Sequence, residues 1–391
     1  MGLSLPLLEY HLESMDNPFC ESLLEGKPVV DVRAPVEFAE GNIPGSINLP
    51  ILNDDERHEI GICYKNLGSA AAIARGYELV SGKNKERKLA AWTQFLRQNP
   101  HSFITCFRGG QRSQISQKWL DEVGFHVLRL DGGYKKARKF FIQSIDSFCK
   151  TFQLVVVSGK TGSHKTKLIH ELSPLKCTLD LEKIACHRGS AFGQMDQPQP
   201  SQAQFENELA VEMLRLVRSS HHHPFICIED ESRMIGKLTQ PQVLFELLRN
   251  SPVAMLDEPL SVRVQNIFET YILHSKIGKF LEEPTDIEPA LATFKSFQQS
   301  VHSISKKLGG EKTSLVLGLL EQAKKDFESS GQLELNCVWI QELLESYYDP
   351  LYLKSLEKRN PQEKFRGTYF EVLNWFENKI NKLPDVSKNE M

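Results

Sequence analysis

The sequence lacks the features that place a protein in a membrane or on a secretory route. No apolar run approaches the ~20 residues that a membrane-spanning helix requires. Residues 1–16 hold a short apolar patch with early acidic side chains and no basic flank, which is unlike a secretory signal. The eight cysteines are scattered without a Cys-x-x-Cys pair, so neither a zinc site nor a disulfide framework is predicted. We expect a cytoplasmic protein without a membrane contact, and we assign no metal-binding residues.

The length and composition predict a globular protein of more than one domain. A chain of 391 residues is longer than one hydrophobic core usually supports. The net charge is only −3, but residues 1–74 hold 4 basic and 12 acidic side chains, whereas residues 75–150 hold 15 basic and 6 acidic. A basic region of this kind suits a polyanionic substrate. No heptad seam that could pair with a copy of itself is visible, so we expect a monomer.

The segment TCFRGGQRS sets a single cysteine into a small cationic loop. Cys106 follows an apolar run, at the place where a buried strand would end. Two adjacent glycines supply a tight bend, whose backbone N–H groups can converge on an anion. Arg108 and Arg112 add positive charge, and a helix expected from Ser113 would point its N-terminal dipole at the same place. Because such a field favours the thiolate over the thiol, the sequence predicts a nucleophile.

The loop by itself leaves the chemistry open. Cys106 and Arg112 satisfy Cys-x5-Arg, the spacing with which protein phosphatases wrap a phosphoryl group. Rhodanese-type sulfurtransferases use the same kind of loop to carry a persulfide. A third interpretation is a non-catalytic regulatory or scaffolding module. The rest of the chain has to separate these possibilities.

The order of apolar runs predicts an α/β fold in three domains. Residues 1–150 alternate short strands with helices, as in a small parallel sheet, and residues 151–260 repeat this order. Beyond residue 260 the strands stop and helical periodicity takes over, so 261–391 is predicted to be a helical C-terminal domain. Strands are expected at 28–33, 102–105, 127–134, 154–157, 177–181, 224–230 and 252–257. Helices are expected at 86–97, from 113 onward, at 201–217 and at 242–248.

The second predicted domain opens with QLVVVSGKTGSHKTKLI, in which a buried strand runs through a Gly-rich turn into a helix. This is the arrangement of a phosphate loop, or P-loop. Lys165 would pair with phosphate oxygens, and Thr166 would offer a ligand to Mg²⁺ near the acidic strand end at 229–231. His164 replaces the last glycine of the consensus, and it adds bulk and a titratable donor where the backbone would approach the phosphates. The candidate phosphate-binding residues are Gly159, Gly162, Ser163, Lys165 and Thr166, and the ligand is either ATP or a diphosphate that is not a nucleotide.

Several stretches together resemble one family. DVRAPVEFAEGNIPGSINLP at 31–50 and CFRGGQRS at 106–113 resemble the opening signature and the active-site loop of rhodanese-like domains. The match is extended by LDGGYKKAR at 130–138, LDLEKIACHRGSAFG at 179–193 and YYDPLY at 347–352. The order of rhodanese-like domain, P-loop domain and helical tail resembles the tRNA 2-selenouridine synthase family over essentially the whole chain.

The resemblance implies an activity. Enzymes of this family replace the 2-thio sulfur of the wobble uridine in tRNA with selenium from selenophosphate, and they attach a geranyl group to that sulfur with geranyl diphosphate. It also implies that Cys106 is the essential cysteine and that the P-loop is the family's phosphate site. We expect Arg108 and Arg112 to hold selenophosphate, and tRNA to be the partner. The basic region then supplies the candidate RNA-binding residues Lys135, Lys136 and Arg138.

Overall fold

The computed structural model describes residues 17–193, 195, 197–219, 225–284 and 286–381. The chain divides into two compact units. Unit 1 combines the residues up to Thr151 with the segment Pro200–Ser219, and unit 2 combines Phe152–Gln199 with the residues from Ser220 onward. Among the described helices, none is both long and apolar enough to cross a membrane.

Unit 1 is built on a parallel four-stranded sheet in the order β2-β1-β3-β4. Its strands are β1 (Val29–Asp31), β2 (Ile47–Asn48), β3 (Phe103–Thr105) and β4 (Leu128–Arg129). The two central strands, β1 and β3, are buried along their whole length, as expected when helices cover both faces of a parallel sheet. The α/β fold predicted for this part of the chain is confirmed.

Five helices of unit 1 lie close in sequence to these strands. They are α2 (Asn17–Leu24), α3 (Pro35–Ala39), α5 (Gly82–Gln98), α6 (Gln111–Glu122) and α7 (Gly133–Thr151). Helix α6 begins two residues before the predicted Ser113, directly after the glycines of the cysteine loop. Its N-terminus therefore lies beside Cys106.

Helix α4 (Asp54–Leu79) was not predicted from the sequence. Ala72 is its only fully buried residue among those described, so no apolar stripe marks the helix. A capping box fixes its start: the Asn53 side chain accepts from the Glu56 N–H at 2.7 Å, and the Glu56 carboxylate accepts from the Asn53 N–H at 2.8 Å. Gly68 interrupts the helix with φ 83°, so α4 consists of two halves joined at a kink.

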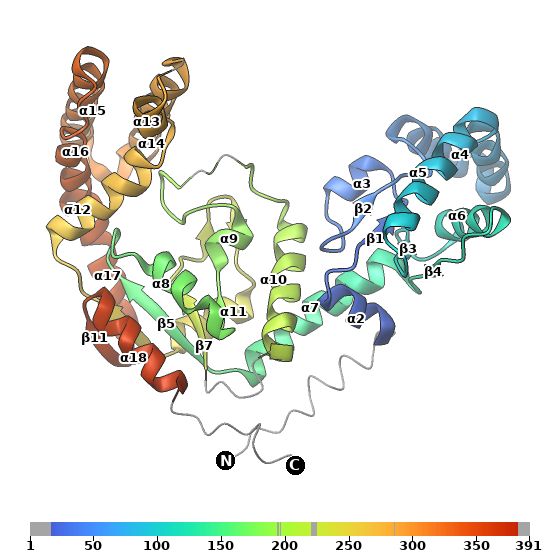
Figure 1. The fold of residues 1–391 in the computed structure, drawn as a ribbon, viewed down its shortest axis with the longest axis horizontal. Helices are drawn as coiled ribbons and strands as arrows, with labels where there is room; N and C mark the ends of the chain where they lie inside the picture. The colour runs from blue at the N-terminus through green and yellow to red at the C-terminus, as the bar shows by residue number, and fades with distance from the viewer. Residues whose placement is uncertain (1–16, 194, 196, 220–224, 285, 382–391) are drawn as a thin grey trace. The chain divides into compact units, whose positions relative to one another are not determined.

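Helix α10 (Gln202–Ser219) belongs to unit 1, although the sequence prediction grouped 201–217 with the P-loop domain. It packs along α7 in Figure 1. The Asn207 side chain donates to the Asn42 carbonyl at 2.7 Å, and Arg138 on α7 forms an ion pair with Glu206. These polar contacts join segments that are far apart in sequence. Local sequence patterns do not predict such contacts.

Unit 2 contains a parallel five-stranded sheet in the order β11-β10-β5-β7-β6. Its strands are β5 (Leu154–Gly159), β6 (Thr178–Leu179), β7 (Ile226–Glu229), β10 (Val253–Leu256) and β11 (Glu363–Gly367), and a small hairpin joins β8 (Met234–Ile235) to β9 (Leu238–Thr239). The expectation that strands stop after residue 260 was wrong, because β11 comes from the far C-terminal part. This edge strand reads EKFRG and is largely exposed, so it has no apolar run to mark it.

The helices of unit 2 cover this sheet and form a separate helical region. Those near the sheet are α8 (Lys165–Leu172), α9 (Leu181–Ala185), α11 (Gln242–Asn250) and α18 (Tyr369–Asn381), with the short 3-10 turn η1 (Ser173–Leu175). The helical region comprises α12 (Leu260–Phe268), η2 (Glu269–Leu273), α13 (Lys276–Glu282), α14 (Glu288–Leu308), α15 (Gly310–Ser330), α16 (Asn336–Leu343), η3 (Leu344–Tyr348) and α17 (Asp349–Arg359). Although this region is helical as predicted, residues 261–391 do not separate as a compact unit of their own, because β11 and α18 complete the P-loop sheet and its core.

Candidate active sites

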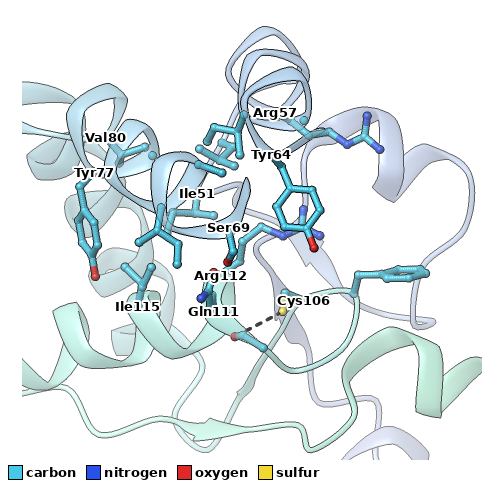
Figure 2. A pocket seen from close by; sticks show the side chains of 18 of the residues that line it. Ile51, Arg57, Tyr64, Ser69, Tyr77, Val80, Cys106, Gln111, Arg112 and Ile115 are labelled. Carbon is cyan, nitrogen blue, oxygen red and sulfur yellow. Dashed lines mark hydrogen bonds between the residues drawn. The ribbon is translucent and has the colours of Figure 1, made fainter. Parts of the chain in front are cut away.

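The thiol of Cys106 lies at the carboxyl end of β3 and is almost buried, with 3% of the residue exposed. Its sulfur is 3.2 Å from the hydroxyl oxygen of Ser113, in the first turn of α6, and 3.8 Å from the carbonyl oxygen of Gly110. Figure 2 shows this thiol at the base of a pocket, with Arg112 reaching into the same space. Ser113 was not among the predicted site residues. Its position in the first helical turn after the loop is the one signal that could have suggested it.

Backbone hydrogen bonds from the start of α7 hold the cysteine loop in place. The N–H groups of Tyr134 and Lys135 donate to the carbonyl oxygens of Cys106 and Phe107, each at 2.9 Å. Across a trans peptide the C=O and the next N–H point in opposite directions, so the N–H groups of Phe107 and Arg108 point away from α7. A Cβ at Gly133 would lie 2.2 Å from the Cys106 carbonyl oxygen, which explains the glycine there.

Arg112 is held by a carboxylate that the sequence analysis did not single out. Its guanidinium forms two hydrogen bonds with Glu37, at 2.5 and 3.1 Å. Burial acts to raise the pKa of Glu37, but the hydrogen bond and charge of Arg112 outweigh it, so this pKa lies below its usual range. Arg57 is also 3.4 Å from the same carboxylate. The positive charge expected at this loop is therefore partly balanced, while the side chain of Arg108 is exposed to solvent.

A cavity of about 880 Å³ opens beside the thiol; we call it the cysteine cavity. Residues of the cysteine loop and of α6 form one side, and α4 forms the other. Figure 2 shows Tyr64 extending from α4 toward the cysteine loop, with Ile51, from the loop before α4, and Ile115, from α6, lining the same space. The cavity thus brings a charged end and an apolar end together next to Cys106.

The three candidate RNA-binding residues on α7 have different surroundings. Lys135 is exposed, and Lys136 pairs with Asp131 at 3.2 Å on the surface. Arg138 is 21% exposed and pairs with Glu206, and it also donates to the Asn207 side chain at 3.0 Å. The structure thus gives Arg138 a role in joining α7 to α10, and leaves the two lysines facing solvent.

The P-loop of unit 2 has the expected order of strand, turn and helix. The Lys165 ammonium donates to the Gly159 carbonyl at 2.9 Å, and the buried Ser163 hydroxyl donates to the Lys160 carbonyl at 2.8 Å. A Cβ at Gly159 would lie 2.6 Å from the Ser163 hydroxyl, and one at Gly162 would lie 2.7 Å from a backbone carbonyl of α12. The predicted phosphate-binding residues are therefore gathered in one tight turn, at the edge of a cavity of about 1350 Å³.

His164 adopts the left-handed conformation, with φ 61° and ψ 35°. A glycine reaches this conformation without a steric penalty, and histidine is among the other residues found there most often. The imidazole lies edge-on to the Tyr369 ring, with the ring centroids 6.3 Å apart. Burial, followed by the nearby charge of Lys167, lowers the pKa of His164. The departure from the consensus thus keeps the backbone shape and adds a half-buried ring.

Three carboxylates face the P-loop. Thr166 donates to Glu182 at 2.8 Å and to Glu229 at 2.9 Å, and oxygens of Glu182, Glu229 and Glu231 lie within 4.8 Å of one another. Burial and mutual repulsion raise the pKa of Glu229 well above its usual value and that of Glu231 to about 8. Carboxylate oxygens are the hard ligands that Mg²⁺ prefers, and a bound cation would relieve the repulsion among these acids. The acids at 229–231 were anticipated, whereas Glu182 was not.

Comparisons with known proteins agree with this architecture. A rhodanese-like domain model matches residues 19–139, and the model "tRNA 2-selenouridine synthase AAA domain" matches residues 152–383. The tRNA 2-selenouridine synthase of Nitrosomonas europaea is 46% identical over 364 residues, which is 90% of this chain and 94% of that protein. The one from Bdellovibrio bacteriovorus is 48% identical and covers 88% of this chain and 93% of its own length. On these matches, which span both units, the chain belongs to the tRNA 2-selenouridine synthase family.

Proposed function

We propose that this chain replaces the 2-thio sulfur of the wobble uridine in tRNA with selenium from selenophosphate, after first alkylating that sulfur with geranyl diphosphate. The observation that carries the proposal is the presence in one chain of two anion-binding arrangements. One is a nearly buried thiol beside Arg112, and the other is a P-loop that faces three carboxylates. The first suits selenophosphate and the second suits a diphosphate. We also propose that the protein acts in the cytoplasm as a monomer.

The first step belongs to the P-loop. The sulfur of 2-thiouridine attacks the first carbon of geranyl diphosphate, a C–S bond forms, and the C–O bond breaks. Pyrophosphate leaves with the bonding electrons, and the uridine ring nitrogen loses its proton to solvent. Lys165 and the turn amides stabilise the departing charge. Mg²⁺ bound by Thr166, Glu182 and Glu229 would add positive charge at the same place.

The second step belongs to the cysteine loop. Selenium of selenophosphate attacks the ring carbon that carries the alkylated sulfur, the C–S bond breaks, and the geranyl thiolate leaves and takes a proton. Water then cleaves the Se–P bond, which releases phosphate and leaves 2-selenouridine. Alkylation helps because a thiolate is a better leaving group than the unmodified thiocarbonyl sulfur. Arg108, Arg112 and the outward-facing amides hold the anionic donor, and the Cys106 thiol gives the leaving geranyl thiolate its proton and regains one from solvent.

Mass spectrometry of the wobble nucleoside tests the proposal. Purified protein is incubated with thiolated tRNA and with geranyl diphosphate, selenophosphate, or both. We expect an S-geranyl product from the first donor alone and a seleno product only when both are present. Cys106→Ala should lose the selenium step and keep alkylation, whereas Lys165→Ala should lose both, by at least about 100-fold for the alkylation rate.

Two matched variants control for loss of structure. Cys149→Ala removes a half-buried thiol from α7, and Lys237→Ala removes an exposed cation from the β8–β9 hairpin. Both should retain the two products. Unchanged tRNA in every reaction with the wild-type protein would contradict the proposal, and so would full selenation by Cys106→Ala.

A further inference from the structure

We infer that the apolar end of the cysteine cavity holds the isoprenoid chain of the S-alkylated uridine while its sulfur lies at Cys106. The inference rests on the proposed function and adds a binding site to it. Selenophosphate is a small anion and would contact only the charged end of the cavity. The apolar end is then free for a second ligand. The alkylated uridine brings a hydrocarbon chain and a reacting sulfur together in one substrate.

The apolar end is built by residues from three segments of unit 1. They come from the loop before α4, from both halves of α4 with the residue after it, and from α6: Ile51, Leu52, Ile60, Ile73, Val80 and Ile115. Ile51, Leu52 and Val80 also belong to the core that packs on the sheet, so this wall is fixed rather than loose. The kink at Gly68 joins the two halves of α4 that contribute Ile60 and Ile73. The unpredicted helix therefore supplies a large part of the apolar surface.

The charged end is equally well defined. Cys106 and Arg112 lie on the cysteine-loop side, and the Glu37 carboxylate fixes the position of the guanidinium. Arg57 and Lys65 of α4 also line the cavity and are exposed. With its isoprenoid chain in the apolar end, the alkylated uridine would thus place its sulfur near the thiol. The cations at the charged end would then be available for selenophosphate and for the RNA backbone.

The dimensions agree with this occupant. A cavity of about 880 Å³ lies in the range of roughly 300–1,000 Å³ that holds small organic ligands. Such sites are mostly apolar, with a few polar groups that fix orientation. The apolar wall includes buried core residues, so it should not yield to a ligand. A substitution that shortens the apolar end should therefore weaken the binding of long isoprenoid chains more than that of short ones.

The test uses an anticodon stem-loop RNA that already carries S-geranyl-2-thiouridine, so that the P-loop step is bypassed. A second RNA carries the shorter S-dimethylallyl group, and a third carries unmodified 2-thiouridine. Ile73→Trp and Ile115→Trp reduce the cavity from opposite walls of the full-length protein. We expect each variant to bind the geranyl RNA at least about tenfold more weakly than wild type, and to bind the dimethylallyl RNA as wild type does.

Leu67→Trp is the matched control, because Leu67 lies on the same helix, is 72% exposed and does not line the cavity. It should bind all three RNAs as wild type does. The inference is overturned if wild type binds the geranyl RNA no more tightly than the thio RNA, or if both tryptophan variants weaken the two alkylated RNAs equally. If wild type binds the geranyl RNA tightly but does not convert it with selenophosphate, the proposed reaction fails while the binding site stands.

Discussion

Gly133 and His164 both have positive φ angles, but for different physical reasons. At Gly133 a side chain would collide with the Cys106 carbonyl, so the glycine is required by space as well as by backbone shape. At His164 the left-handed conformation is occupied by a residue with a Cβ, at an intrinsic cost of roughly 1–2 kcal/mol. The edge-on contact of the imidazole with Tyr369 offsets part of that cost.

Substitution of His164 should therefore separate backbone shape from side-chain bulk. His164→Gly keeps the loop conformation, so we expect its free energy of unfolding to stay within about 1 kcal/mol of wild type, and its affinity for inorganic pyrophosphate to be equal or higher. His164→Val should lower the free energy of unfolding by about 1–2 kcal/mol, because β-branched residues are outliers in the left-handed conformation. Urea unfolding with and without pyrophosphate measures both effects. Lys176→Val is the control: Lys176 has φ 54° outside the P-loop, so its change should lower stability without altering pyrophosphate affinity. Tighter binding by His164→Val than by His164→Gly would contradict this account.

At the same scale, the sequence predicted the groups that belong to local motifs and missed their partners. Cys106 and Lys165 were singled out because a loop and a P-loop each have a characteristic spacing, and their roles stay predictions. Glu37 and Glu182 could not, since they meet Arg112 and Thr166 only after the chain folds over separations of 75 and 16 residues. Nothing in the local sequence distinguishes either glutamate from an ordinary surface acid.

At the scale of elements, the basic residues of α7 have different surroundings. One face carries Arg138, which joins the helix to α10, and the N-terminal end carries the exposed Lys135. The sequence treated KKARK as a single basic run, because charge alone does not reveal which side chain has an internal partner. Helix α4 and strand β11 were missed for a different reason, because their burial is too slight to leave an apolar pattern.

These two basic residues should therefore respond differently to substitution. Arg138→Ala removes a partly buried ion pair and should lower the free energy of unfolding by about 1 kcal/mol, with little change in the salt dependence of tRNA binding. Lys135→Glu places an acid near the N-terminus of α7, which the helix dipole favours, so stability should hold. It should weaken tRNA binding and reduce the slope of log affinity against log salt by about 1. If Arg138→Ala, Glu206→Ala and the double variant all lose the same free energy of unfolding, the ion pair stabilises the protein. If the loss in the double variant is the sum of the two single losses, the pair does not contribute.

At the scale of the whole molecule, the C-terminal segment is part of the P-loop unit. β11 pairs with β10, and α18 contributes Val372 and Phe376 to the core that also contains β5 and α8. The domain boundary predicted at residue 260 therefore divides residues that share one core. The sequence showed helical periodicity in this segment correctly, but periodicity does not tell which core a helix joins.

A pair of phenylalanines in α18 tests this arrangement. Phe376 is fully buried, so Phe376→Ala should lower the free energy of unfolding of unit 2 by about 3–5 kcal/mol. Phe370 lies on the same helix but is 73% exposed, and Phe370→Ala should change it by no more than about 0.5 kcal/mol. Urea denaturation followed by far-UV circular dichroism gives both values. Equal effects would show that α18 does not pack on the P-loop core.

The placement of α10 also has a consequence for how the protein is made. The chain passes between the units after Thr151, after Gln199 and after Ser219, so unit 1 is not contiguous in sequence. Domains usually fold in order as they leave the ribosome. Here α10, the last segment of the cysteine-bearing unit, is synthesised only after the P-loop strand β5 and helix α8. Ribosome pausing before residue 219 would leave the face of α7 that α10 covers exposed on the nascent chain.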